Sequence, residues 1–170
     1  MDKGSFPVIC AIALNYALGP SPRHSSLLRE NFRSAEEVFA LKSSSRRLLF
    51  QNHPELQVLC DDRILDKAQM EYDKLSAKGV TFLSIFDSSY PSLLKECPDA
   101  PMLLYLKSPS PPGDIFRQEC YISIVGTRQM DSYGRDWTRR IVYAISRSAQ
   151  KCVIVSGLAI GADITARLAA

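Results

Sequence analysis

The chain has 170 residues, of which 46% are hydrophobic and 23% are charged, a composition typical of a soluble globular protein with one or two domains. The net charge of +3 says little about a partner. Because no apolar run approaches membrane-spanning length and the apolar N-terminal segment lacks a signal-peptide cleavage site, we exclude a membrane protein and disfavour a secreted one.

The first third of the chain predicts small helices with short connections. An apolar stretch over 6–18 ends at Gly19, prolines break the chain at 20–22, and a second short helix is expected over 24–32. Ser34 and Glu37 form a capping box that opens a third helix, ending near residue 42.

A longer helix and two strands follow. Asp62 can cap this helix and Gly79 can end it. Its expected buried stripe consists of Ile64, Leu65, Ala68, Tyr72 and Leu75. Residues 80–85 and 102–106 are predicted strands.

The Pro/Ser-rich segment 108–114 is the clearest boundary in the chain, because its residues continue neither a helix nor a central strand. We predict a helical domain over 1–60, connecting elements over 61–107, this linker, and an α/β core over 115–170. Residues 115–170 hold eight basic against four acidic residues, whereas 1–114 hold thirteen against fourteen. The positive excess therefore lies in the α/β part.

Residues 121–166 predict a β-α-β-α unit. The apolar, β-branched runs 121–125 and 152–155 are typical of strands covered on both faces by helices. The helix expected over 132–149 carries an apolar stripe that should pack on the sheet, formed by Trp137, Ile141, Ala144 and Ile145. A right-handed crossover then brings both strand-to-helix turns to one edge of a parallel sheet.

That edge is where open α/β sheets bind ligands, because helix N-termini present unpaired N–H groups there. Gly126 ends the first strand, Ser156 and Gly157 end the second, and Gly161 allows close backbone approach. Arg128 lies in the first turn, where its planar guanidinium suits phosphate. These residue types predict a phosphate site.

The five cysteines are Cys10, Cys60, Cys97, Cys120 and Cys152. Their number is odd and none form a C-x-x-C pair, so we predict buried, reduced thiols of a cytoplasmic protein. With only two histidines in the chain, no metal site or cofactor is expected.

Catalysis is not expected either. No histidine lies in the α/β half to activate Ser156, and the G-x-S-x-G elbow is missing. Asp163 is better interpreted as a carboxylate that complements the positive end of the last helix.

Three motifs together resemble the DNA-processing protein A family, also called DprA or Smf. They are V-G-T-R followed by S-Y-G-R over 125–135, V-S-G-L-A-I-G-A-D over 155–163, and F-D-S-S-Y-P-S-L-L with P-D-A-P-M-L-L-Y-L-K over 86–107. The resemblance implies an α/β architecture in which a small helical, sterile-alpha-motif-like (SAM-like) domain precedes a Rossmann-like parallel βαβα core. The core is expected to be truncated, because only nine residues follow Gly161.

The resemblance also implies a non-enzymatic function: binding of single-stranded DNA and loading of the RecA recombinase during natural transformation. By motif, the DNA-binding residues would be Gly126, Thr127, Arg128, Ser156, Gly157 and Gly161, with Tyr133, Gly134 and Asp163 also carried over. Among these, Arg128, Ser156 and Gly157 are the expected phosphate contacts. An exposed edge of an incomplete sheet would favour a homodimer. Arg167 and Ala162 depart from the family pattern.

Two other functions remain open. The first is a nucleotide-binding enzyme of the same fold that resembles the phosphoribohydrolases, although their proline-glycine-glycine signature is missing. The second is an inert truncated copy.

Overall fold

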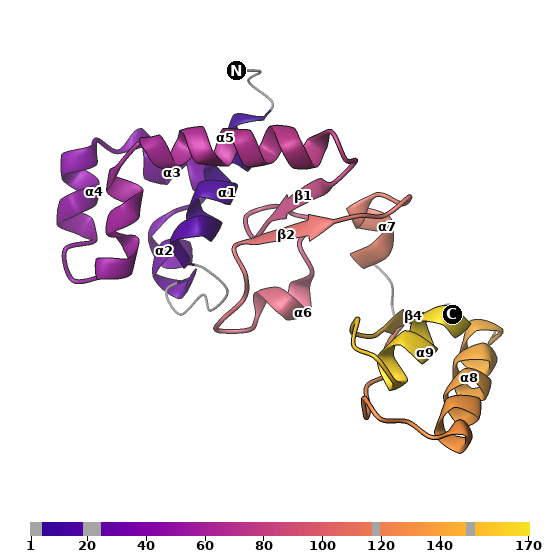
Figure 1. Ribbon diagram of the computed structural model, residues 1–170. Helices are drawn as coiled ribbons and strands as arrows, with labels where there is room; N and C mark the ends of the chain where they lie inside the picture. Colours follow the sequence, from indigo (N-terminus) through magenta and orange to yellow (C-terminus); the bar gives the residue numbers. More distant parts are fainter. Residues whose placement is uncertain (1–4, 19–24, 117–119, 149–151) are drawn as a thin grey trace. The chain divides into compact units, whose positions relative to one another are not determined.

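The computed structural model describes residues 5–18, 25–116, 120–148 and 152–170, and Figure 1 shows the order of its elements. Contacts between residues divide the chain into two compact units, Met1–Gly113 and Asp114–Ala170. The predicted break at 20–22 lies outside the described residues. No helix in the described part of the chain combines the length and the hydropathy needed to cross a lipid bilayer.

The first unit is mainly helical. Its elements are α1 (Phe6–Leu18), α2 (Ser25–Asn31), α3 (Ala35–Ala40), α4 (Ser43–Leu49), the 3-10 helix η1 (Pro54–Cys60), α5 (Arg63–Ser76), β1 (Thr81–Ser84), α6 (Ser92–Lys95) and β2 (Leu103–Leu106). The sequence analysis missed α4, η1 and α6.

Helix α1 is the centre of this unit. It packs against α5, α3 and η1, and all six residues from Ile9 to Leu14 are buried. A helix that is apolar on every side must be covered on every side to be stable in water. The other elements of the unit provide that cover, and Figure 1 shows α1 passing beside α5.

The amphipathic helix α5 is confirmed, but its first turn differs from the prediction. Ile64 and Ala68 are buried, and Gly79, with φ of +70°, follows its end. Asp62 makes no side-chain cap. Instead, Asp61 Oδ1 accepts a 3.0 Å hydrogen bond from the Arg63 amide, which leaves Asp62 for another partner.

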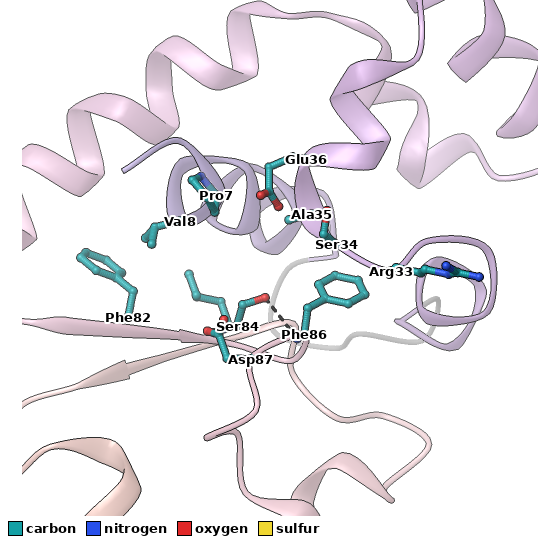
Figure 2. Close-up of a pocket in the computed structure, with 11 residues that line it drawn as sticks. Pro7, Val8, Arg33, Ser34, Ala35, Glu36, Phe82, Ser84, Phe86 and Asp87 are labelled. Carbon is teal, nitrogen blue, oxygen red and sulfur yellow. Dashed lines mark hydrogen bonds between the residues drawn. The ribbon is translucent and has the colours of Figure 1, made fainter. Parts of the chain in front are cut away.

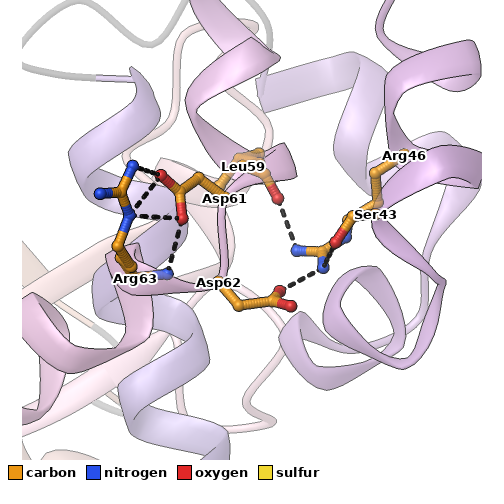
Figure 3. Close-up of polar contacts among 6 residues, drawn as sticks. All are labelled: Ser43, Arg46, Leu59, Asp61, Asp62 and Arg63. Atoms are coloured by element: carbon orange, nitrogen blue, oxygen red, sulfur yellow. Dashed lines mark hydrogen bonds and ion pairs between the residues drawn. The ribbon is translucent and has the colours of Figure 1, made fainter.

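The partner of Asp62 is Arg46. Among the described residues, Arg46 has the only charged side chain that is fully buried. Its guanidinium donates to the Leu59 carbonyl at 2.5 Å and to Ser43 Oγ at 3.3 Å, and pairs with Asp62. Figure 3 shows these contacts joining α4, η1 and the start of α5. Since a buried charge is costly unless it is paired, this network explains how α4 can place an arginine in the core.

The capping box at α3 is only half formed. Ser34 is the N-cap residue, but its side chain makes no cap hydrogen bond. Glu37 reaches back as expected, yet it accepts from the Arg33 amide at 2.7 Å instead of the amide of Ser34. The helix also ends at Ala40, two residues earlier than expected.

Strands β1 and β2 form an antiparallel pair in which Thr81 lies opposite Leu106 and Ser84 opposite Leu103. After this pair, α7 (Pro112–Phe116) begins inside the Pro/Ser-rich segment. The C-terminal end of the predicted linker is therefore helical, because proline is compatible with the first turn of a helix.

The second unit is the predicted parallel β-α-β-α arrangement. It contains β3 (Cys120–Ser123), α8 (Ser132–Ser146), β4 (Cys152–Val155) and α9 (Ala162–Ala169). The two strands are parallel, with Cys120 opposite Cys152 and Ser123 opposite Val155. A helical unit followed by a parallel βαβα core confirms the predicted fold class.

Burial in this second unit is much lower than predicted. Trp137 is 46% exposed and Ile141 is 50% exposed, while Val142 is buried. Helix α8 packs mainly against α9 and less against β4. In β3, Tyr121 and Ser123 are exposed, so this strand is not covered on both faces. The physical reason is that a two-stranded sheet is too narrow to cover the apolar stripe of a 15-residue helix.

The cysteine prediction was wrong for two of the five residues. Cys120 and Cys152 form a disulfide across the first paired position of β3 and β4. Cys10 and Cys60 are buried free thiols, whereas free Cys97 is half-buried. Burial, followed by the charge of Glu36, raises the pKa of Cys10 to about 12, so that thiol is chemically inert at neutral pH.

Candidate nucleic-acid interface

The two strand-to-helix turns of the second unit touch each other. The amide of Ala162, the first residue of α9, donates a 3.1 Å hydrogen bond to the carbonyl oxygen of Thr127. Gly161 has φ of +91°, and a Cβ added to it would clash with the Thr127 carbonyl and lie 2.8 Å from Arg128 Cα. Only glycine combines this φ with such close backbone approach.

Gly126 is also required where the two turns meet, because a larger residue would not fit there. A Cβ on Gly126 would lie 2.8 Å from the Cβ of Ala162, and Ala162 is itself buried. The structure thus brings Gly126, Thr127, Arg128 and Gly161 together at the carboxyl ends of β3 and β4, where the sequence analysis expected them.

Arg128 is exposed, and its guanidinium has no ion-pair partner among the described residues. Neighbouring arginines are already engaged: Arg135 donates to the Met130 carbonyl at 2.5 Å, and Arg139 lies 3.6 Å from Asp136. An unpaired, solvated guanidinium can contact a phosphate without first breaking another interaction. Arg128 is therefore the cation at this edge best placed to take an anion.

Backbone donors accompany Arg128. The amides of Gly126, Thr127, Arg128 and Gly157 have no acceptor within the described ranges. Unpaired N–H groups at adjacent strand ends form the kind of concave donor set that binds anions.

The side chains of Thr127 and Ser156 are used within the protein. Thr127 Oγ1 accepts from the Gln129 amide and donates to the Gln129 carbonyl, both at 3.1 Å. Ser156 Oγ donates to the Ile124 carbonyl at 2.7 Å. Since a hydroxyl has one proton, Ser156 in this arrangement joins the ends of β3 and β4 and offers a phosphate no hydrogen.

Two carboxylates occupy the helix N-termini at this edge. Asp131 caps α8 by accepting a 2.7 Å hydrogen bond from the Gly134 amide. Asp163, in the first turn of α9, lies against Gly157. The sequence analysis missed Asp131, although an aspartate just before a predicted helix start is a strong N-cap signal. Both acids repel a phosphate, so Arg128 and the free amides must outweigh the charges of Asp131 and Asp163 for an anion to bind at this edge.

A hollow of about 420 Å³ adjoins this turn. It is lined by Ile124, Val125, Gly126, Thr127, Gln129, Met130, Asp131, Gly134, Thr138 and Ala162. Among the residues that the structure describes, no group of three His, Cys, Asp or Glu side chains could hold a metal ion.

Comparison with known proteins places the chain in a family. Residues 81–170 match the model of the DNA recombination-mediator protein A family. The chain belongs to this family. It is also 39% identical over 89 residues to the protein Smf of Synechocystis sp., a match covering 52% of this chain and 22% of Smf.

The X-ray structure of DNA processing protein A (DprA) from Streptococcus pneumoniae aligns with a TM-score of 0.46 and 22% identity, covering 75% of this chain and 48% of DprA. The chain thus spans less than half the length of these two relatives. The match to the recombination-mediator family begins at β1 and includes both glycine turns. Helices α1 to α5 lie outside it.

Proposed function

We propose that this chain binds single-stranded DNA through the turns that follow β3 and β4. The observation that carries the proposal is the backbone contact between Gly161 and the Thr127–Arg128 turn, with Arg128 unpaired beside free amides. A guanidinium and backbone N–H groups contact phosphates without reading bases, so we expect binding that is independent of sequence and sensitive to salt.

The further parts of the proposal come from the family. As a member of the recombination-mediator family, the chain would assist loading of RecA on single-stranded DNA during natural transformation, as a cytoplasmic, non-enzymatic protein. Exposed apolar residues of the second unit, including Val125, Leu158 and Leu168, support a homodimer as part of this proposal. Light scattering of the purified chain tests the dimer.

DNA binding is tested by fluorescence anisotropy with a labelled oligothymidylate of about 20 nucleotides. Arg128→Ala should weaken binding roughly three- to tenfold at low salt, and should lower the slope of log affinity against log salt by about 0.7. Arg147→Ala is the matched control, because Arg147 is also exposed but follows the other end of α8.

Equal affinity of the Arg128→Ala variant and the parent would overturn the site. Binding of a mononucleotide such as AMP, with no binding of DNA, would instead favour the phosphoribohydrolase-like alternative. If the chain binds neither ligand, it is inert by itself. The RecA part is tested separately, by measuring whether the chain raises RecA ATPase activity on DNA coated with single-strand-binding protein.

A further inference from the structure

The first unit contains a groove that the proposed function does not use. It has a volume of about 580 Å³ and is formed by α2, α6 and the segment that follows β1. Its lining residues are Ser26, Arg29, Glu30, Phe32, Arg33, Ile85, Phe86 and Lys95. Phe32 and Ile85 are buried, so the groove has an apolar base and charged walls.

The two arginines of the groove come from α2 and from the segment that follows it. Ser26, Arg29 and Glu30 lie on one side of α2, at spacings of three and four residues, whereas Arg33 lies two residues after the helix ends at Asn31. Ser25 and Leu28 of the same helix are buried. Lys95, the last residue of α6, adds a third cation from a different element.

The lining of the groove carries an excess of positive charge. Three cations line it with one carboxylate, that of Glu30. No described carboxylate lies within ion-pair distance of Arg29, Arg33 or Lys95. Since basic and acidic residues are nearly equal in number over 1–114, this excess is a local concentration of charge, and a groove with net positive charge attracts anionic ligands.

A neighbouring hollow has the opposite balance of charge. The smaller hollow, of about 170 Å³, lies between α1, α3 and β1, and its charged lining residues are Arg33, Glu36 and Asp87. Figure 2 shows Glu36 directed toward that hollow and the guanidinium of Arg33 directed away from it. Arg33 and the half-buried Phe86 line both hollows, so Phe86 brings an aromatic side chain to the groove that holds the three cations.

From these observations we infer that the Arg29–Arg33–Lys95 groove is a second contact for the sugar-phosphate backbone of single-stranded DNA. The inference rests on the proposed DNA ligand but on different residues, in the other unit. Cations that contact phosphates beside an aromatic ring on which a base can stack are the combination used by sites for single-stranded nucleic acids. An acidic protein segment would also pair with the three cations, but it has no bases to stack on Phe86.

The test uses the whole chain and the labelled oligothymidylate. The variant Arg29→Gln/Arg33→Gln/Lys95→Gln removes three charges and keeps polar side chains. Its control, Lys67→Gln/Lys74→Gln/Lys78→Gln, removes three exposed charges from the same unit, in and just after α5. The groove variant should bind roughly tenfold more weakly at low salt and lower the salt slope by about 2. The control should remain within about twofold of the parent.

Two outcomes separate this inference from the proposed function. If Arg128→Ala weakens binding and the groove variant does not, the groove inference is wrong and the turn site stands. If the groove variant weakens binding and Arg128→Ala does not, the groove is supported and the turn site is wrong. A parent chain that binds no DNA overturns both.

A second measurement uses the unaltered chain and so does not depend on whether the variants fold. Acylation of Lys95 in the unaltered chain, followed by mass spectrometry, should slow at least threefold when oligothymidylate is bound, whereas acylation of Lys74 should not change. Equal rates at Lys95 with and without DNA would contradict the inference. Protection of Lys95 by polyglutamate, with none by DNA, would identify an acidic protein ligand and overturn it as well.

Discussion

The amide of Ala162 donates a hydrogen bond to the carbonyl of Thr127, and this bond attaches the start of α9 to the turn after β3. The two residues are far apart in sequence, yet their contact brings Arg128 to the end of β4. Any change that separates them should disturb both the stability of the second unit and its DNA binding.

Gly161→Ala should separate them. The substitution places a Cβ at φ of +91° against the backbone of Thr127 and Arg128, and we expect it to lower the free energy of unfolding of this unit by about 2–4 kcal/mol. Urea unfolding followed by the fluorescence of Trp137, the only tryptophan in the sequence, measures the change. Gly113→Ala is the control, since nothing lies within 4 Å of its added Cβ. Similar unfolding midpoints for the two variants would show that the turns do not need this contact.

Asp163→Asn should strengthen DNA binding. The carboxylate of Asp163 lies against Gly157, whose free amide is one of the proposed phosphate contacts, and its negative charge opposes a phosphate there. We expect a two- to fivefold gain in affinity for oligothymidylate at low salt, measured by anisotropy. Asp136→Asn, on the exposed surface of α8, should change affinity less. A loss of affinity in the Asp163 variant would mean that this residue supports the turn more than it repels DNA.

The Cys120–Cys152 disulfide predicts that the second unit depends on redox conditions. It links residues separated by 32 positions, and closing a loop of that length stabilises by roughly 3–4 kcal/mol in the chain-entropy model. Dithiothreitol should therefore lower the urea midpoint reported by Trp137. In the Cys120→Ser/Cys152→Ser variant, the reductant should have no effect.

Counting thiols checks the disulfide directly. Iodoacetamide should modify three cysteines in the denatured, unreduced protein and five after reduction, by mass spectrometry. Five modified cysteines without reductant would restore the expectation of reduced thiols, which suits a cytoplasm in which glutathione keeps thiols reduced.

A tyrosine pair predicts a loss of stability at alkaline pH in the first unit. Tyr105 donates a 2.6 Å hydrogen bond to one oxygen of Glu71, and Tyr16 donates to the other. The hydrogen bond to Glu71, with smaller effects of burial and of the Glu71 charge, raises the pKa of Tyr16 to about 12. Burial, followed by the bond to Glu71, raises the pKa of Tyr105 still further.

Because folding raises these tyrosine pKa values above the ordinary value of 10.0, the protonated tyrosines stabilise the folded state. This contribution is fully present below pH 10 and is lost as the pH rises toward 12. Urea unfolding followed by circular dichroism should show a larger drop between pH 8 and pH 11 in the parent than in Tyr16→Phe/Tyr105→Phe. Tyr133→Phe, at an exposed ring, should leave the parent's drop unchanged. Equal drops in all three proteins would show that Glu71 does not hold these protons.

Several features were predictable because they depend on near neighbours in the chain. The apolar run of α1, the β-branched run of β4 and the left-handed glycine after α5 each have a local cause: uniform hydropathy, β-propensity, or a conformation that only glycine adopts easily. The parallel arrangement of β3 and β4 also followed, because a strand, a helix and a second strand have few ways to connect.

Tertiary structure alone decided the features that depend on residues distant in the chain. The register of β3 and β4 places Cys120 opposite Cys152, and the packing of α4 against η1 turns Arg46 toward Asp62. Sequence patterns do not specify which residues of two paired strands lie opposite each other. They also do not reveal which surfaces a narrow sheet leaves uncovered, so the exposure of Trp137 was not predictable. Burial and pairing of this kind depend on the three-dimensional arrangement of the whole unit, whereas the chemistry of the two glycine turns is already present in a few consecutive residues.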